Sequence, residues 1–374
     1  MAKTVNHKDR GHALLSASSA HRWLTCPPSA LAAELYPAQD TDYTREGTEA
    51  HEVAEQIANG RPVDEGKHPK EMIENAEAYR DYIQEHTRSP LSLKLLEQRV
   101  DFSPWVPDGF GTCDCIIIED DLLTVIDYKY GIGVPVSAEK NPQMMLYALG
   151  ALNDYGFAYD VDQIEMHIFQ PRIDNISVDR ISVTDLLAWA DGTVKPTAAL
   201  AAEGKGEYLP GAHCKFCPHA GKCRELAKVC TDFVTRNRQK VPVEKLAPHE
   251  ISEILSTAPM IETWLKRVQD TALTGMLNGE TVPGYKVVAG RASRAWKDDL
   301  CVSEELQRQG FSREDITKTE LLSVAAMEKA IGKKKVAELV GALIDTKTGN
   351  PTIAPETDKR PAYNREEEIK KDFE

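Results

Sequence analysis

Hydrophobic positions in the N-terminal part of the chain recur at a helical spacing. Helices are expected at 16–35, broken by Pro27–Pro28, and at 45–58 and 71–86. In the third helix apolar side chains recur every three or four residues, at Met72, Ala76, Tyr79 and Ile83. Because such a stripe packs against a core, this part of the chain is predicted to be helical and partly buried.

The pattern then changes to short, β-branched runs, which are typical of strands. Three strands are expected, at 93–102, 111–119 and 122–130. They are followed by a helix at 141–153, a strand at 163–170 and a helix near 184–202. This order predicts an α/β fold in which a mixed central sheet is flanked by helices.

The C-terminal third of the chain has a different character. Helices are expected at 249–278 and 320–343, and a strand-like run lies at 282–290. The chain ends in a polar, proline-containing tail. We therefore expect one domain over residues 1–235 and a mainly helical accessory region over residues 236–374.

Composition places the 374-residue chain among ordinary globular proteins, with 41% hydrophobic and 28% charged residues. No apolar run approaches the roughly 20 residues that a membrane span needs, and the N-terminus lacks the apolar core of a signal peptide. A cytoplasmic location is therefore expected. In that setting the eight cysteines are predicted to be metal ligands or buried thiols.

The net charge of −14 argues against a nucleic-acid partner, but the charge is unevenly distributed. Residues 40–86 are strongly acidic, whereas residues 205–240 hold eight Lys and Arg against three Asp and Glu. Because the local field matters more to a polyanion than the total charge, nucleic acid remains a candidate partner.

Two aspartates face each other in the hairpin predicted from the second and third strands. A two-residue loop at Asp120–Asp121 puts Asp114 opposite Asp127, and Lys129 shares the face of Asp127. Opposed carboxylates repel each other unless a cation lies between them, and carboxylates are the ligands that Mg²⁺ and Mn²⁺ prefer. Such a site, with a lysine beside it, is suited to phosphate chemistry. The alternative is a pair of solvated aspartates.

Asp114 and the run Asp127-Tyr128-Lys129 resemble the active-site signature of the PD-(D/E)XK nuclease superfamily. The wider pattern resembles its RecB-like branch, through an upstream Gly47-x-x-x-His51 and a downstream Gln143-x-x-x-Tyr147. The elements occur in family order over residues 45–147. The resemblance implies the nuclease core of that superfamily, a mixed central sheet flanked by helices.

The resemblance also implies a role for each matched residue. The metal, Mg²⁺ or Mn²⁺, would be held by His51, Asp114, Asp127 and the backbone carbonyl of Tyr128. The catalytic set would be Asp114, Asp127, Lys129, Glu97, Gln143 and Tyr147, with Glu97 as the acid of the preceding strand. Gln143 and Tyr147 would line the path to the cleft and contact DNA or the lysine. Ordinary packing on a helix is the alternative for these last two residues and for His51.

Three cysteines, Cys214, Cys217 and Cys223, show a C-x₂-C-x₅-C spacing that favours metal binding. From the spacing alone, zinc completed by a nearby histidine, or a set of reduced thiols, are both chemically reasonable. Cys230 is a further possible ligand.

RecB-like nuclease domains of the AddB type hold a [4Fe–4S] cluster on one N-terminal and three C-terminal cysteines. The run Trp23-Leu-Thr-Cys26-Pro27 is similar to their N-terminal element. The resemblance therefore implies a cluster on Cys26, Cys214, Cys217 and Cys223 that ties the two ends of the domain together. Structural Zn²⁺ is the alternative.

No Walker A motif accompanies these elements, so no motor domain is expected. A stand-alone domain of this kind resembles phage-encoded recombination exonucleases, which pass their product to a single-strand annealing protein. The resemblance implies DNA as substrate, with Lys222 and Arg224 among its contacts, in a bacterial or phage-infected cell. A structure-specific endonuclease and a catalytically silent DNA-binding protein remain alternatives.

Overall fold

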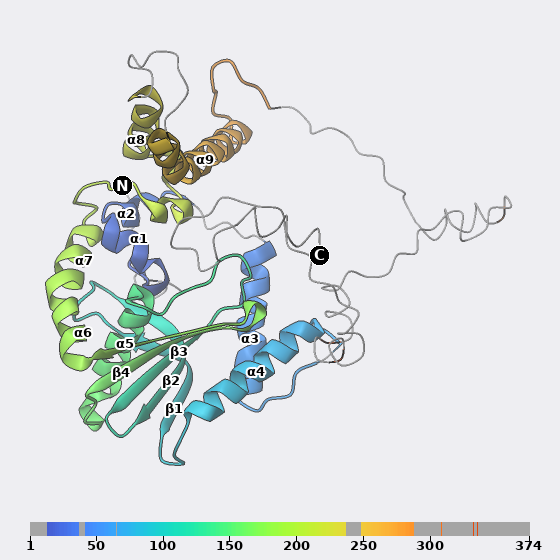
Figure 1. The fold of residues 1–374 in the computed structure, drawn as a ribbon, viewed down its shortest axis with the longest axis vertical. Helices are drawn as coiled ribbons and strands as arrows, with labels where there is room; N and C mark the ends of the chain where they lie inside the picture. The colour runs from blue at the N-terminus through green and yellow to red at the C-terminus, as the bar shows by residue number, and fades with distance from the viewer. Residues whose placement is uncertain are drawn as a thin grey trace, which may run out of the picture. The chain divides into compact units, whose positions relative to one another are not determined.

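The computed structural model describes residues 13–36, 42–64, 66–236 and 248–287, and the single residues 308, 332 and 335. The chain divides into two compact units, Met1–Gly290 and Arg291–Glu374. The four described ranges all belong to the first unit (Figure 1). The domain boundary expected at residue 235 stays a prediction.

Five strands form one sheet in chain order: β1 (Leu93–Asp101), β2 (Phe110–Glu119), β3 (Leu122–Tyr128), β4 (Gln163–Gln170) and β5 (Asn175–Ser182). β3 and β4 are parallel because the chain crosses over through helix α5 (Pro142–Tyr155), and the other neighbours are antiparallel. The predicted mixed α/β sheet flanked by helices is confirmed.

Helices cover both faces of this sheet. α5 packs on one face, while α3 (Asp42–Ala58) and α4 (Lys70–His86) pack on the other (Figure 1). Ile116 and Ile118 of β2 belong to the hydrophobic cluster under α5, and Cys115 and Ile117 to the cluster under α3 and α4. A strand buried on both faces explains the continuous apolar run that the sequence shows there.

The helices predicted within the described ranges are found with small changes at their ends, whereas the helix expected at 320–343 and the polar tail lie outside those ranges. The proline pair separates α1 (Ala20–Thr25) from α2 (Ser29–Ala33), and the predicted apolar stripe of α4 is fully buried. The single helix expected near 184–202 is instead α6 (Val183–Trp189) and α7 (Lys195–Ala202), joined by a π-helical turn at Ala190–Val194. Pro196 explains the interruption, because its ring nitrogen cannot donate to the preceding turn.

Two expectations about strands were wrong. β5 was not predicted, because its pattern is inverted for a half-buried strand: Ile176 and Val178 are exposed, and the alternating polar residues Asn175, Ser177 and Asp179 are half-buried. The strand expected at 282–290 is absent over its described part, since residues 282–287 form a turn and irregular backbone.

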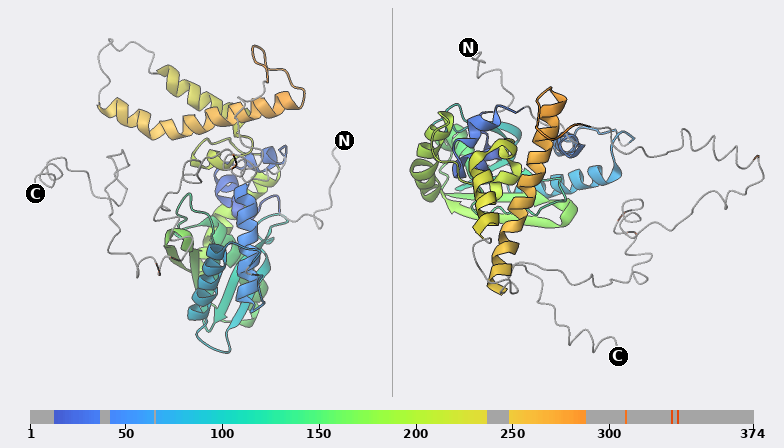
Figure 2. Two further views of the ribbon diagram at one scale, coloured as in Figure 1. Left: turned by 90° about the vertical axis from the view of Figure 1, so that its right-hand side faces the viewer. Right: turned by 90° about the horizontal axis from the view of Figure 1, so that it is seen from above.

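The cysteine-bearing segment continues into a pair of helices, α8 (Arg224–Arg236) and α9 (Pro248–Leu277). α9 packs across the short helices Ala212–Phe216 and Ala220–Lys222 and beside α8 (Figure 2). The packing is close at Gly221, where a Cβ would lie 2.5 Å from the Arg267 carbonyl oxygen. No helix in the described ranges is both long enough and apolar enough to cross a membrane.

Candidate metal centre and cysteine cavity

The two aspartates singled out in the sequence lie on neighbouring strands, with exposed fractions of 9% for Asp114 and 2% for Asp127. The β2–β3 ladder ends at Cys115↔Ile126, so the next opposed positions are Asp114 and Asp127. The register predicted from a two-residue turn is therefore the register that the sheet adopts. Solvated aspartates on an open sheet face do not fit this burial.

Glu97 lies on a third strand, beside the two aspartates. Glu97, Asp114 and Asp127 together are called the carboxylate row. Glu97 lies on β1 between Leu96, which pairs with Cys115, and Gln98, which pairs with Cys113, and so is level with Asp114. Its backbone has a φ of 47°, a left-handed conformation that costs a non-glycine residue roughly 1 kcal/mol or more. Backbone strain of this kind is often found where a side chain must be aimed at a functional site.

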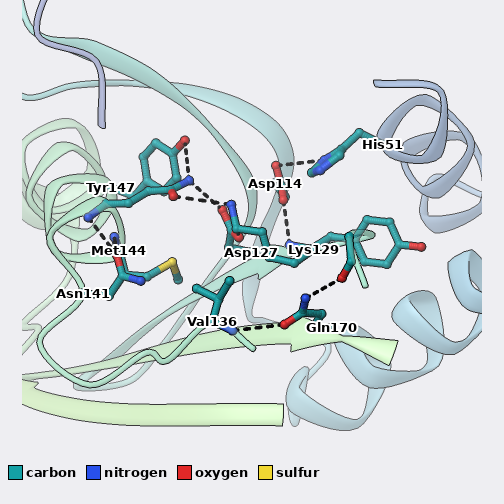
Figure 3. Close-up of polar contacts among 12 residues, drawn as sticks. His51, Asp114, Asp127, Lys129, Val136, Asn141, Met144, Tyr147 and Gln170 are labelled. Carbon is teal, nitrogen blue, oxygen red and sulfur yellow. Dashed lines mark hydrogen bonds and ion pairs between the residues drawn. The ribbon is translucent and has the colours of Figure 1, made fainter. Parts of the chain in front are cut away.

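His51 reaches the same row from α3. Its Nδ1 lies 3.5 Å from Asp114 Oδ1, and its ring packs edge-on against Tyr128 at 5.5 Å between ring centroids (Figure 3). Ligand atoms of His51, Glu97 and Asp114 all lie within 4.8 Å of one another. In the described part of the chain no other group of three such side chains is as close.

Lys129 lies beside Asp127 and is held there by α5. Its Nζ is 2.9 Å from Asp127 Oδ2 and 3.4 Å from Gln143 Oε1, and Gln143 Nε2 donates to Asp127 Oδ1 at 3.0 Å. The amide of Gln143 also donates to the Tyr147 hydroxyl at 3.3 Å, so the two residues act one helical turn apart (Figure 3). The predicted contact between this helix and the lysine is present.

The start of α5 fixes the position of Gln143. The Asn141 side chain caps the helix by accepting hydrogen bonds from the backbone N–H of Gln143 and of Met144, at 3.0 and 3.5 Å. Pro142 occupies the first helical position, where no N–H is needed. The local sequence Asn141-Pro142-Gln143 therefore fixes where α5 begins, and with it the position of the Gln143 amide.

Asp114 and Asp127 differ in how their oxygens are satisfied. Asp114 Oδ2 accepts from the backbone N–H of Tyr128 at 2.7 Å, whereas Asp127 Oδ2 has no partner with hydrogen-bond geometry and only its contact with Lys129. Asp127 Oδ2 is therefore satisfied by the charge of the Lys129 ammonium. Nothing in the structure bears on the predicted role of the Tyr128 carbonyl.

The charges of the site act strongly on one another. Burial lowers the pKa of His51, but the Asp114 carboxylate outweighs it and brings this pKa to about 9. Burial, reinforced by Asp114, raises the pKa of Glu97 to about 7. Burial also raises the pKa of Asp127, against the opposing effect of the Lys129 ammonium. The row thus carries more negative charge than its surroundings stabilise, a condition that a divalent cation would relieve.

The four predicted cluster cysteines line one small cavity. Cys26 comes from the end of α1, and Cys214, Cys217 and Cys223 come from the segment that precedes α8. Burial raises the pKa of the Cys214 thiol, and the three other sulfurs add to the effect. The fold therefore brings together residues that are far apart in the sequence.

The spacing of these sulfurs is wider than a single small ion requires. Over the described ranges, no three cysteine sulfurs lie within 4.8 Å of one another. His213 and His219 also line the cavity, and His213 Nε2 lies 3.9 Å from Cys214 Sγ. Cys230 is fully buried in the adjoining hydrophobic cluster, beside Cys217.

Lys222 and Arg224, the predicted DNA contacts, lie on the cysteine-bearing segment and are both exposed. Lys222 Nζ is 3.5 Å from Glu280 Oε1. They belong to a different part of the unit from the carboxylate row. Their contact with DNA stays a prediction.

Sequence reasoning missed two buried polar residues near the site, Gln170 and Arg172, on either side of Pro171. Gln170 hydrogen-bonds the loop that follows Lys129, and Arg172 contacts acids on both α3 and α4. Neither belongs to a motif or a periodic pattern, so no sequence signal pointed to them.

Fold and site together define a mixed α/β protein with a candidate divalent-metal centre on three adjacent strands. The chain belongs to the family described as Protein of unknown function (DUF2800), whose model matches residues 12–361. Among solved structures it is similar to the crystal structure of SSO0001, with 14% identity over 59% of this chain and 89% of that chain. The TM-score of 0.27 is too low for this similarity to bear on function.

Proposed function

We propose that this protein is a metal-dependent DNA nuclease of the RecB-like PD-(D/E)XK type, acting as an exonuclease on duplex ends. The observation that carries the proposal is the row of Glu97, Asp114 and Asp127 across three strands. Lys129 contacts its last member, and His51 contacts Asp114. This is the set of groups that the sequence resemblance implies.

The metal-binding residues would be His51, Glu97, Asp114 and Asp127. The fit is supported by the mutual proximity of the first three. Carboxylate oxygens suit Mg²⁺, and an imidazole ligand favours Mn²⁺. When bound, such an ion supplies an activated water and stabilises the negative charge on the phosphate.

The chain's own groups divide the remaining work. Burial lowers the pKa of Lys129, but Asp127 outweighs it and holds this pKa above its usual value. Lys129 therefore stays an ammonium, suited to neutralising charge on phosphoryl oxygens rather than to accepting a proton. Gln143 holds this ammonium against Asp127.

We also propose that Cys26, Cys214, Cys217 and Cys223 hold a [4Fe–4S] cluster. A tetrahedral zinc ion with Zn–S bonds of about 2.3 Å would bring its sulfurs to about 4 Å from one another. The sulfurs of a four-iron cluster are farther apart, because irons and sulfides lie between them. The shared cavity supports a metal centre on these four residues, and metal analysis decides between iron and zinc. The contribution of this centre would be to tie α1 to the segment before α8.

Digestion of linear and covalently closed circular duplex DNA with Mn²⁺ or Mg²⁺ tests the proposed activity. We expect loss of linear DNA from its ends and survival of the circle. Cutting of the circle would favour the structure-specific endonuclease. Binding of DNA without cleavage of either substrate would favour the catalytically silent protein. Exonuclease products would then be the natural substrate of a single-strand annealing partner.

A further inference from the structure

Arg172 is a buried cation that the proposed reaction does not use. Its side chain is 9% exposed, and it lies in the short helix Pro171–Ile173 directly after β4. The guanidinium carbon lies 4.4 Å from the centre of the Tyr130 ring, one residue past Lys129. A charged group is rarely buried to this extent without paired acids.

The acids around Arg172 come from two helices. Nη1 donates to Glu46 Oε1 on α3 at 3.2 Å. Nε and Nη2 donate to the two oxygens of Glu71 on α4, at 3.4 and 3.5 Å. One edge of the planar guanidinium thus contacts α3, another edge contacts α4, and its face packs on the Tyr130 ring. A lysine has no such fork and could not make all three contacts at once.

This arrangement links the helix that carries His51 to the strands that carry the aspartates. Glu46 lies five residues before His51 on α3, and Tyr130 continues from the end of β3. His51 Nδ1 lies 3.5 Å from Asp114 Oδ1 in the carboxylate row. Its distance from the row therefore depends on where α3 is held.

We propose that Arg172 is a positioning residue that holds α3 at the distance from the sheet at which His51 can bind the metal. The proposal rests on the metal site put forward above. Glu46 is the contact that transmits this effect to α3. Glu71 anchors the same guanidinium to α4, which supplies none of the proposed metal ligands.

Three charge-matched variants separate positioning from simple loss of negative charge. Glu46→Gln removes the ion pair with α3, and Glu71→Gln removes the ion pair with α4. Glu49→Gln removes an acid from α3 nearer to His51, but one that pairs with His68. Each variant removes one negative charge and keeps the shape of the side chain.

Binding of Mn²⁺ to the DNA-free protein is measured by electron paramagnetic resonance, and coupling of the imidazole nitrogen by electron spin echo modulation. In the wild type we expect nitrogen coupling, and His51→Ala should abolish it. Glu46→Gln should weaken Mn²⁺ binding by about 10-fold, the usual effect of losing a residue that orients a ligand, and should diminish the nitrogen signal. Glu49→Gln and Glu71→Gln should change both by less than about two-fold.

Equal effects of the three Glu→Gln variants on Mn²⁺ binding would show that only the lost charge matters, and would overturn the positioning role. A Glu46→Gln protein with normal affinity and normal nitrogen coupling would overturn it as well. Absence of Mn²⁺ binding in the wild type would remove the metal site and this inference with it. Because no DNA is used, failure to cleave DNA would leave the result for Arg172 readable. Arg172→Lys serves as a second variant, and it should behave as Glu46→Gln does.

Discussion

At the scale of single residues, the site gathers three carboxyl groups, Glu97, Asp114 and Asp127, beside the cationic side chains of His51 and Lys129. Asp114 is stabilised by His51 and by the Tyr128 N–H, and burial raises the pKa of Asp127 despite Lys129. The left-handed backbone at Glu97 adds strain to the same row. The burial of Asp127 and the backbone strain at Glu97 both reduce the stability of the fold. Such a cost is expected where function needs charges close together.

Asp127→Asn should reduce metal-dependent cleavage of linear DNA by on the order of 100-fold or more, because the proposed metal loses a carboxylate ligand. The rate of end digestion with saturating Mn²⁺ measures the effect. Asp120→Asn is the matched control, since it lies in the hairpin turn with a φ of 50°, where Asn is readily accommodated. Comparable rates for the two variants would show that the carboxylate row is not the active site.

The raised pKa of His51 predicts a pH dependence of the metal-free protein. Its contact with Asp114 is fully stabilising below the unfolded pKa of 6.5 and is lost as pH rises through the folded pKa of about 9. The melting temperature of the wild type should therefore exceed that of His51→Gln most at pH 6, and the difference should shrink towards pH 9.5. Calorimetry with a chelator present measures both proteins, and a difference that does not vary with pH would contradict the ion pair.

At the scale of elements, β5 and the end of β4 fasten the loop between Lys129 and α5. Gln170 Nε2 donates to the carbonyl oxygens of Gly131 and Val134, at 2.5 and 3.2 Å, and its Oε1 accepts from Val136 N–H at 3.1 Å. Ser177 accepts from Ala138 N–H at 2.9 Å. The polar face of β5 therefore replaces the backbone pairing that this loop lacks.

Gln170→Leu should loosen this loop, because backbone groups that the amide now satisfies would lose their partner at a cost of about 1–3 kcal/mol. Hydrogen exchange of the Val136 amide should speed up, while exchange in β2 and β3 stays slow. Ser177→Ala removes only the bond to Ala138 and should have the smaller effect. Unchanged protection at Val136 would mean that the loop is held by other contacts.

At the scale of the whole described unit, the cysteine cavity lies between a segment that precedes the sheet and one that follows it. α1 precedes all five strands, and the segment of Cys214 to Cys223 follows them. A cross-link between residues 26 and 214 closes a very long loop, which restricts the unfolded chain more than a short one would. Loading of the proposed cluster should therefore be coupled to folding of the unit.

Cys26→Ser should lower iron content and visible absorption of anaerobically purified protein as completely as Cys217→Ser, and should lower the melting temperature similarly. The reason is that Cys26 supplies the remote ligand. Cys230→Ser, at the buried cysteine beside Cys217, is the control and should retain iron. One zinc and no iron per chain would replace the cluster with a zinc site. A fully coloured Cys26→Ser protein would place the fourth ligand elsewhere.

The sequence by itself determined the parts of this protein that depend on local pattern. A run that is apolar throughout, as at residues 116–118, indicates a strand buried on both faces, and a two-residue turn sets the register that opposes Asp114 and Asp127. The Asn141 cap and the spacing of Gln143 and Tyr147 are likewise local features. Residues within one strand, turn or helix have positions fixed by short-range geometry.

Tertiary structure alone decided which side chains from distant parts of the chain come into contact. The pairing of β1 with β2 put Glu97 in the carboxylate row, and the burial of Arg172 between α3 and α4 created its contacts with Glu46 and Glu71. β5 was missed because its covered face is polar, and that face is explained only by the loop that it holds. Contacts between residues far apart in the chain depend on how whole elements pack, and no local pattern encodes that packing.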